Sequence, residues 1–235
     1  MFSLDPLTTG TLMIMAASTP LECEMPAPTQ ISVVPRTAKL VIDTSQTHAQ
    51  LQEQVIDTIN PYGYSQVTHT NGYMSGELKF RSKVQLDFAQ MPQYEAFCVW
   101  YKSIEIDIDI APKVVIAKEV AEDKCMYEAV LEHEMKHVNA ERSVANKFAQ
   151  TVGRTVFDGL KERGFKAGPM RAEHVEKIGD RMKQTVEQLV QFEFKKFEIE
   201  RQEAQQAIDN LEEYESVSAK CPKYRSPVSA NYGKN

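Results

Sequence analysis

Two histidines and a glutamate lie close together in the segment His133-Glu134-Met135-Lys136-His137, an H-E-x-x-H pattern. The surrounding stretch, Cys125 to Ala149, has a helical pattern, so residues four positions apart lie on one face of the helix. Two imidazoles placed in this way can bind one zinc ion at ~2.0–2.1 Å. Glu134 follows the first histidine and would act as a general base on the water that the zinc activates. The pattern therefore predicts a catalytic zinc site.

A third protein ligand is needed, because catalytic zinc normally binds three protein side chains and a water molecule. Glu141 is our first candidate. It continues the helical series one turn beyond His137, and its side chain would lean back towards the metal. Glu173 and His174 are the alternatives, since a second helix that returns along the first could bring either residue to the histidine pair.

The elements that must position this site change character along the chain. From Ile31 to about Ile116 the pattern is typical of strands, and most runs alternate apolar and polar residues. Such alternation predicts an antiparallel sheet with one solvated face. His48 and His69 fall within this region, and we expect both to be polar surface residues. The predicted strands are Ile31–Val34, Ala38–Ile42, Glu77–Phe88 and Ile104–Ile110, with a short helix at Ala49–Ile59.

From about Ala117 the period becomes that of helices. The stretch Val120–Leu160 contains no proline, and after a break at Gly164–Pro169 a long amphipathic stretch runs over Arg171–Lys220. The predicted fold class is α+β: a small antiparallel sheet, then the H-E-x-x-H helix, then a long C-terminal helical region. We expect four parts, which are a leader-like segment and linker (1–29), a catalytic domain (30–165), the long helical region (166–221) and a tail (222–235).

Composition restricts the class of partner. The 235 residues carry a net charge of −6, which argues against nucleic acid as the main partner because phosphate binding depends on clustered Lys and Arg. No apolar run approaches the ~18 residues that a bilayer span requires, so we expect no membrane span in the mature chain.

The cysteines and the N-terminus bear on the compartment. The chain has four cysteines and no C-x-x-C pair, which predicts two disulfides, with four buried free thiols as the alternative. We expect Cys98 to pair with Cys125, which leaves Cys23 and Cys221 to join the two ends of the fold. The apolar run Leu12–Ala17 resembles the end of a signal peptide, although no basic residue precedes it. Together these features favour a periplasmic or secreted protein.

The segment from Cys98 to Glu141 resembles the predicted secreted zinc-dependent proteases of bacteria, which belong to the H-E-x-x-H zincin class. The resemblance depends on the β run that ends at Ile110, the apolar segment Pro112–Ala117 and the helix that carries the motif. It implies a zincin-like domain with zinc on His133 and His137 and with Glu134 as the catalytic base. It also implies that a strand, here Val114–Ala117, lies along the active-site cleft and pairs with an extended peptide.

We therefore expect a zinc metallopeptidase that cleaves peptide or protein substrates. Tyr127 or His174 could stabilise the oxyanion. The alternatives are a zinc hydrolase that acts on another bond, and a non-enzymatic metal-binding or helical interaction protein of the cell envelope. In the last case the helix over Arg171–Lys220 could also form a homodimer.

Overall fold

The computed structural model describes residues 22–54 and 70–225. The leader-like segment up to residue 21, the last five residues of the expected helix Ala49–Ile59 and His69 lie outside the described residues. The part of that helix that is described forms α1 (His48–Gln52), where the side chain of Thr47 accepts a hydrogen bond from the backbone N–H of Gln50.

The sheet is built around one long strand, β4 (Ala96–Ile116). On one side β3 (Gly72–Met91) forms a long antiparallel hairpin with β4, joined by the short 3₁₀ helix η1 (Pro92–Tyr94). On the other side β1 (Gln30–Thr37) and β2 (Val41–Asp43) pair with β4 in parallel. Near the tip of the hairpin β5 (Lys166–Met170) pairs with β4 in the antiparallel direction.

The prediction of a small antiparallel sheet is therefore wrong. The sheet has five strands, two of its strand pairings are parallel, and its central hairpin has strands of 20 and 21 residues. Alternation of apolar and polar residues shows which face of a strand is buried, but it says nothing about the direction of the neighbouring strand. The strand expected at Ile31–Val34 lies within β1, whereas the one expected at Ala38–Ile42 shares only its last two residues with β2.

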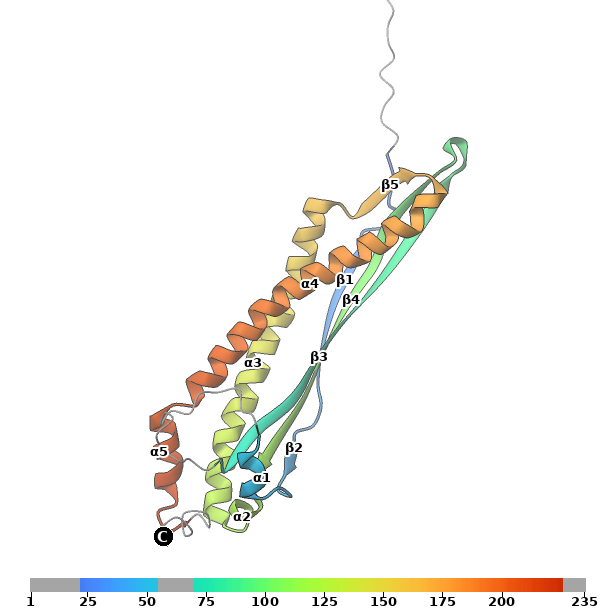
Figure 1. Ribbon diagram of the computed structural model, residues 1–235. Coiled ribbons are helices and arrows are strands. Elements are labelled where there is room, and N and C mark those ends of the chain that lie inside the picture. Colours follow the sequence, from blue (N-terminus) through green and yellow to red (C-terminus); the bar gives the residue numbers. More distant parts are fainter. Residues whose placement is uncertain (1–21, 55–69, 226–235) are drawn as a thin grey trace, which may run out of the picture.

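Two long helices cover one face of this sheet (Figure 1). After the short α2 (Lys118–Ala121), α3 (Lys124–Arg163) runs for 40 residues, or ~60 Å. The chain turns through β5 and returns as α4 (Ala172–Ile208), which packs along α3 in the opposite direction. A final short helix, α5 (Leu211–Lys220), lies beside the beginning of α3.

The main core lies between the sheet and the helix pair. Ile104, Ile106 and Ile108 of β4 are fully buried and pack with apolar residues of both α3 and α4. The segments 30–165 and 166–221 thus share one core.

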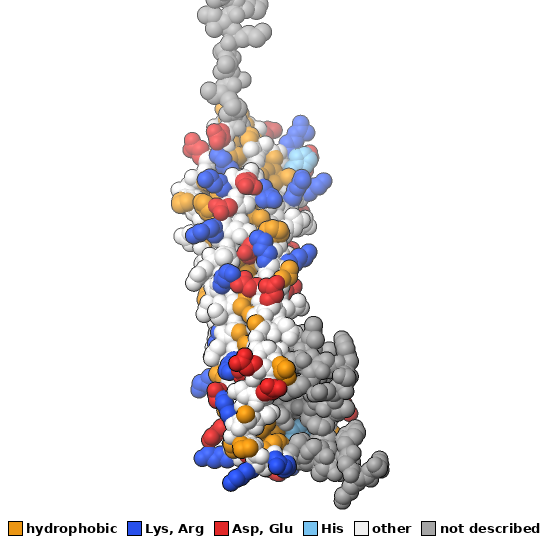
Figure 2. Space-filling model, turned by 90° about the vertical axis from the view of Figure 1, so that its left-hand side faces the viewer, with side chains coloured by type: hydrophobic (Ala, Val, Ile, Leu, Met, Phe, Trp, Pro, Cys, Tyr) orange, Lys and Arg blue, Asp and Glu red, His pale blue; other side chains and the backbone are white. Residues whose placement is uncertain are grey.

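On the opposite face of β4, acidic side chains form ion pairs with cations of β1 and β3; the pairs include Arg36–Asp107, Arg81–Asp109 and Lys83–Glu105. On the helical face in Figure 2, acidic and basic side chains are interspersed.

A second, smaller core supports the beginning of α3. Val114–Ala117 at the end of β4 are completely buried, together with Val120 of α2 and Leu51 of α1. Ala129 and Val130 of α3 pack into the same cluster. This packing fixes the first turns of α3, which precede the H-E-x-x-H segment.

Two disulfides join Cys23 to Cys98 and Cys125 to Cys221. The expected Cys98–Cys125 pair is therefore wrong. Cys98 lies near the hairpin tip, whereas Cys125 follows the other end of β4; the 19 residues from Cys98 to Ile116 span ~60 Å of extended strand. In the described residues, no helix is both long enough and apolar enough to cross a membrane.

Candidate metal site

The two histidines of the motif lie on the buried side of α3. His133 and His137 are 8% and 6% exposed, and their rings meet edge to face. The two Nε2 atoms are 3.3 Å apart. The helical spacing of four residues thus brings the imidazoles together, as the sequence predicts.

Asp209 is the third member of this cluster. It lies at the C-terminal end of α4, in the connection to α5, and is 6% exposed. Its Oδ1 lies 3.1 Å from Nε2 of His137 and 3.3 Å from Nε2 of His133. One carboxylate oxygen therefore faces both imidazole nitrogens.

The three donor atoms have the mutual spacing of metal ligands. In a tetrahedral site with bonds of ~2.0–2.2 Å, neighbouring ligand atoms lie ~3.3–3.6 Å apart. The three separations among His133, His137 and Asp209 are 3.3, 3.3 and 3.1 Å. The three side chains could therefore hold a metal ion after only a small adjustment.

The other nitrogen of each imidazole also has a partner. Nδ1 of His137 lies 2.5 Å from Oε1 of Gln205, and Nδ1 of His133 lies 3.3 Å from Oε1 of Glu213. The Gln205 amide also donates to the backbone carbonyl of His137, so it holds this histidine at two points. An acceptor at each Nδ1 favours the tautomer with its proton there, which leaves Nε2 free to bind a metal.

Glu134, the residue after His133, packs against the beginning of β3. It is 3% exposed, and its side chain accepts a hydrogen bond from the backbone N–H of Met74. A Cβ added at Gly72 would lie 3.3 Å from its Oε1, so the missing side chain of Gly72 leaves room for the carboxylate. Burial raises the pKa of Glu134 to about 7, although the nearby histidines lower it. A carboxyl group with this pKa can both accept and release a proton near neutral pH.

The electrostatics of the histidines depend on Asp209. Burial lowers the pKa of each imidazole, but the hydrogen bond to Asp209 and the nearby charge of Glu134 outweigh it, so that both pKa values lie above the usual 6.5. In the protein without metal, the cluster therefore tends to hold protons between the imidazoles and the carboxylate.

The other candidate ligands lie elsewhere. Glu141 is buried, but its Oε2 faces Nε of Arg201 on α4 at 3.3 Å, one turn beyond His137. Glu173 and His174 are exposed at the first turn of α4, whereas Asp209 follows its last turn, ~50 Å away along the helix. The carboxylate that lies against the histidine pair does come from a returning helix, but from its C-terminal end and not from Glu173 or His174.

Asp209 is not among the ligand candidates that the sequence suggests. The available signal was the interruption of the helical pattern at Asp209-Asn210, where Asn210 caps α5 by accepting a hydrogen bond from the backbone N–H of Glu213. A polar interruption after a long amphipathic helix usually marks only the end of that helix. Only the length of α4 identifies this break as the point that meets His137.

Three further expectations concern residues around the site. His48 is 1% exposed, not a surface residue, and its Nε2 faces Oδ1 of Asn71 at 3.1 Å. The strand Val114–Ala117 is buried between β2 and β3, so it has no edge for a peptide. Tyr127 is half-buried in the smaller core, whereas the ring of Tyr214 on α5 lies 5.5 Å from the His133 ring.

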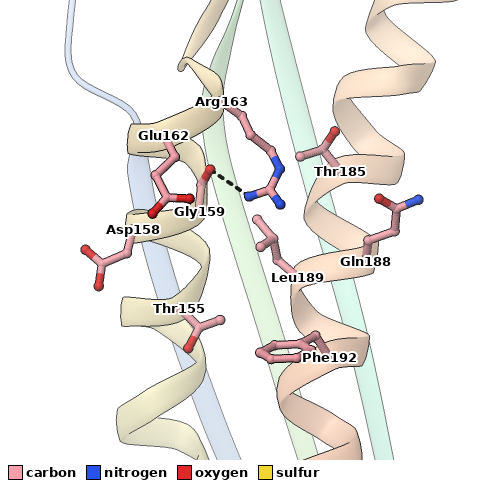
Figure 3. Close-up of a pocket in the computed structure, with 9 residues that line it drawn as sticks. All are labelled: Thr155, Asp158, Gly159, Glu162, Arg163, Thr185, Gln188, Leu189 and Phe192. Atoms are coloured by element: carbon pink, nitrogen blue, oxygen red, sulfur yellow. Dashed lines mark hydrogen bonds between the residues drawn. The ribbon is translucent and has the colours of Figure 1, made fainter.

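A groove lies between the last turns of α3 and the middle of α4 (Figure 3), away from this cluster in both helices. Arg163 points into the gap and donates a hydrogen bond to the carbonyl of Gly159, while Asp158 and Glu162 point outwards. Leu189 and Phe192 line the α4 side. Among the described residues, His133, His137 and Asp209 are grouped as possible metal donors, and no such group lies in this groove.

Comparisons with protein-family models, with curated proteins and with solved structures find no match to this chain.

Proposed function

We propose that this protein is a zinc-dependent peptidase in which His133, His137 and Asp209 hold the metal and Glu134 is the general base. The observation that carries the proposal is the spacing of the three donor atoms, which are 3.1 to 3.3 Å apart on a buried surface. The H-E-x-x-H spacing supports the same chemistry, because it places a buried glutamate beside two metal-binding histidines.

Zinc is the metal that this donor set favours. Two imidazole nitrogens and one carboxylate oxygen form a typical catalytic zinc site with one position left for water. Calcium and magnesium prefer sites made of oxygen atoms alone. The Nδ1 contacts of His137 with Gln205 and of His133 with Glu213 support this role, since metal-bound histidines usually donate their second N–H to an acceptor.

Zinc in such a site supplies Lewis-acid catalysis and lowers the pKa of water to about 7. Glu134 would take the proton of the attacking water on its carboxylate and then give it to the leaving amine. Its burial between α3 and β3 fits this task, because a pKa of about 7 allows both transfers near neutral pH. Tyr214, next to His133, is better placed than Tyr127 or His174 to donate a hydrogen bond to the reacting carbonyl.

An extended peptide would pair with β3 and not with Val114–Ala117. In the described part of the sheet, β4 is flanked on both sides, whereas β3 pairs with β4 alone. The first residues of β3 contact Glu134, so a peptide along this edge would pass close to the proposed base.

We also propose that the protein is exported to the periplasm or secreted. Two disulfides are present, and disulfides persist mainly in oxidising compartments. Recovery of the protein from a cytosolic fraction with free thiols at Cys23 and Cys98 would contradict this assignment.

The central test compares wild type with Glu134→Gln. Each protein is stripped with a chelator, reloaded with zinc, and assayed on a mixture of unstructured peptides by mass spectrometry. We expect both proteins to bind one zinc and only the wild type to cleave peptides, because the amide cannot accept a proton. Wild type that binds no zinc, or Glu134→Gln that cleaves at the wild-type rate, would refute the proposal.

A non-enzymatic metal site is the second candidate, and one observation favours it. All three donors are less than one-tenth exposed, which is typical of structural zinc sites that are closed to substrate. In that case the wild type binds zinc and unfolds at a lower temperature without it, but it cleaves no peptide in the same assay.

A further inference from the structure

The short helix α5 lies next to the candidate metal site and determines where Asp209 sits. Asp209 and Asn210 form the whole connection between α4 and α5. The two histidines belong to one rigid helix, whereas Asp209 is carried at the junction of two others (Figure 1). The site is therefore complete only while this junction stays against α3.

The apolar burial of α5 is small. Val217 is the one buried residue of α5, and a helix of ten residues is marginal on its own in water. The remaining contacts include the ion pairs Lys136–Glu213 at 2.6 Å and Lys220–Glu132 at 2.7 Å, which lie at the surface. Surface ion pairs hold such a helix only weakly.

The Cys125–Cys221 disulfide supplies a stronger connection. Cys221 is the residue directly after α5, and Cys125 lies in the first turn of α3. The helix is therefore fixed at one end by its connection to α4 and at the other by a covalent bond. Glu213 is held between these points, at 3.3 Å from Nδ1 of His133.

The two disulfides differ in their access to solvent. Cys23 and Cys98 are 2% and 3% exposed and pack with Trp100 at the hairpin end of the molecule. Cys125 is exposed, although its partner Cys221 is 5% exposed. A reductant therefore meets the disulfide beside the metal site first.

We infer that the Cys125–Cys221 disulfide holds α5 as a strap over α3, and that its reduction weakens metal binding by releasing Asp209 and Glu213 from the histidines. The inference depends on the proposed metal site. The reductant is a dithiol: it gives two electrons and two protons to the disulfide, so that two protein thiols form and the dithiol becomes a cyclic disulfide. The Cys23–Cys98 disulfide, at the other end of the fold, has no such effect.

The first experiment compares Cys125→Ser/Cys221→Ser with Cys23→Ser/Cys98→Ser as the matched control. Zinc affinity is measured by competition with a chromophoric chelator, and hydrogen exchange is measured on the metal-free proteins. We expect the first variant to bind zinc ~10–100-fold more weakly, as when outer contacts of a metal site are lost, and to lose protection in α5. The control should bind zinc as tightly as the wild type does.

The second experiment uses the wild-type chain and avoids any variant that fails to fold. The protein is treated with a dithiol without denaturant, alkylated, freed of reagent and titrated with zinc. We expect Cys125 and Cys221 to be alkylated first, with a parallel loss of zinc affinity. Equal zinc affinity before and after this modification, or reduction of Cys23–Cys98 first, overturns the inference while leaving the metal site standing. An oxidised wild type that binds no zinc instead overturns the metal site itself.

Discussion

Oδ1 of Asp209 lies 3.1 Å from Nε2 of His137, although 72 residues separate them in the sequence. The contact joins the end of α4 to the middle of α3 and completes a cluster that His133 and His137 begin. It exists because α4 is long enough to return from the hairpin end of the molecule to the histidines. A local motif and a distant residue thus form one site.

Replacement of the carboxylate tests this assignment most directly. Asp209→Asn keeps the size of the side chain but removes its charge, and we expect zinc affinity to fall by ~100-fold or more because one of three protein ligands is weakened. The measurement is chelator competition on the metal-free proteins. Glu173→Gln is the matched control, since this exposed carboxylate lies on the first turn of the same helix.

Glu141→Gln separates the two assignments of the third ligand. We expect it to lower stability, since it leaves the Arg201 guanidinium without its buried partner, but to leave zinc affinity within about threefold of wild type. If Glu141→Gln weakens zinc binding strongly and Asp209→Asn does not, Glu141 is the ligand, as the sequence first suggested.

The part of the site that follows from the sequence is the part governed by helix geometry. Spacing of four residues is enough to place His133 and His137 on one face, and Glu134 beside them. Asp209 could not be identified in this way, because its contact depends on the length of α4 and the turn through β5. Glu141 was attractive only because it is near in sequence, and its partner Arg201 comes from the same returning helix.

Gln205 is predicted to be a positioning residue for the metal. Its amide accepts from Nδ1 of His137 and donates to the carbonyl of the same residue. Gln205→Ala should lower zinc affinity ~10–100-fold, because the imidazole of His137 is then no longer held in one orientation and one tautomer. Gln202→Ala, at an exposed position three residues earlier on α4, is the control. Equal affinities for the two variants would mean that the contact with Gln205 contributes nothing to metal binding.

Residue patterns in the sequence indicate which face of a strand is buried. They do not indicate which strands pair or in which direction. Ile104–Ile110 alternates in the sequence and forms a strand with one buried face, as expected, and its isoleucines pack with the helices. Pro112 made β4 look shorter than it is, because proline inside a strand removes a donor. Because β4 runs from Ala96 to Ile116, Cys98 and Cys125 lie towards opposite ends of it and do not pair.

The stability of the metal-free protein should fall as pH rises from about 5 to 8. Glu134 has a pKa of about 7 in the fold against 4.5 otherwise, so between these values the folded protein keeps a proton that the unfolded chain has lost. The raised pKa values of His133 and His137 act in the same direction above pH 6.5. The raised pKa of Glu134 alone lowers the free energy of unfolding by up to about 3 kcal/mol over this pH range.

Urea unfolding at a series of pH values, with chelator present, measures this dependence. Glu134→Gln should show a smaller loss of stability with pH between 4.5 and 7, since its amide does not titrate. Excess zinc should reverse the trend in wild type, because metal binding requires deprotonated imidazoles. A metal-free wild type that becomes more stable from pH 5 to pH 7 would contradict the proton assignment.

Two glycines on β3 provide a matched test of the space around Glu134. A Cβ at Gly72 would lie 2.8 Å from Cγ1 of Val130 and 3.3 Å from Oε1 of Glu134, whereas a Cβ at Gly76 meets nothing closer than 3.4 Å. Gly72→Ala should therefore lower the free energy of unfolding by ~1–3 kcal/mol and reduce peptide cleavage, because the clash displaces the base. Gly76→Ala should change neither property appreciably. Thermal unfolding and the peptide assay measure both, and zinc content should stay equal in the two variants, since neither glycine touches a ligand. Full activity in Gly72→Ala would show that the close packing of Glu134 against β3 is not needed for catalysis.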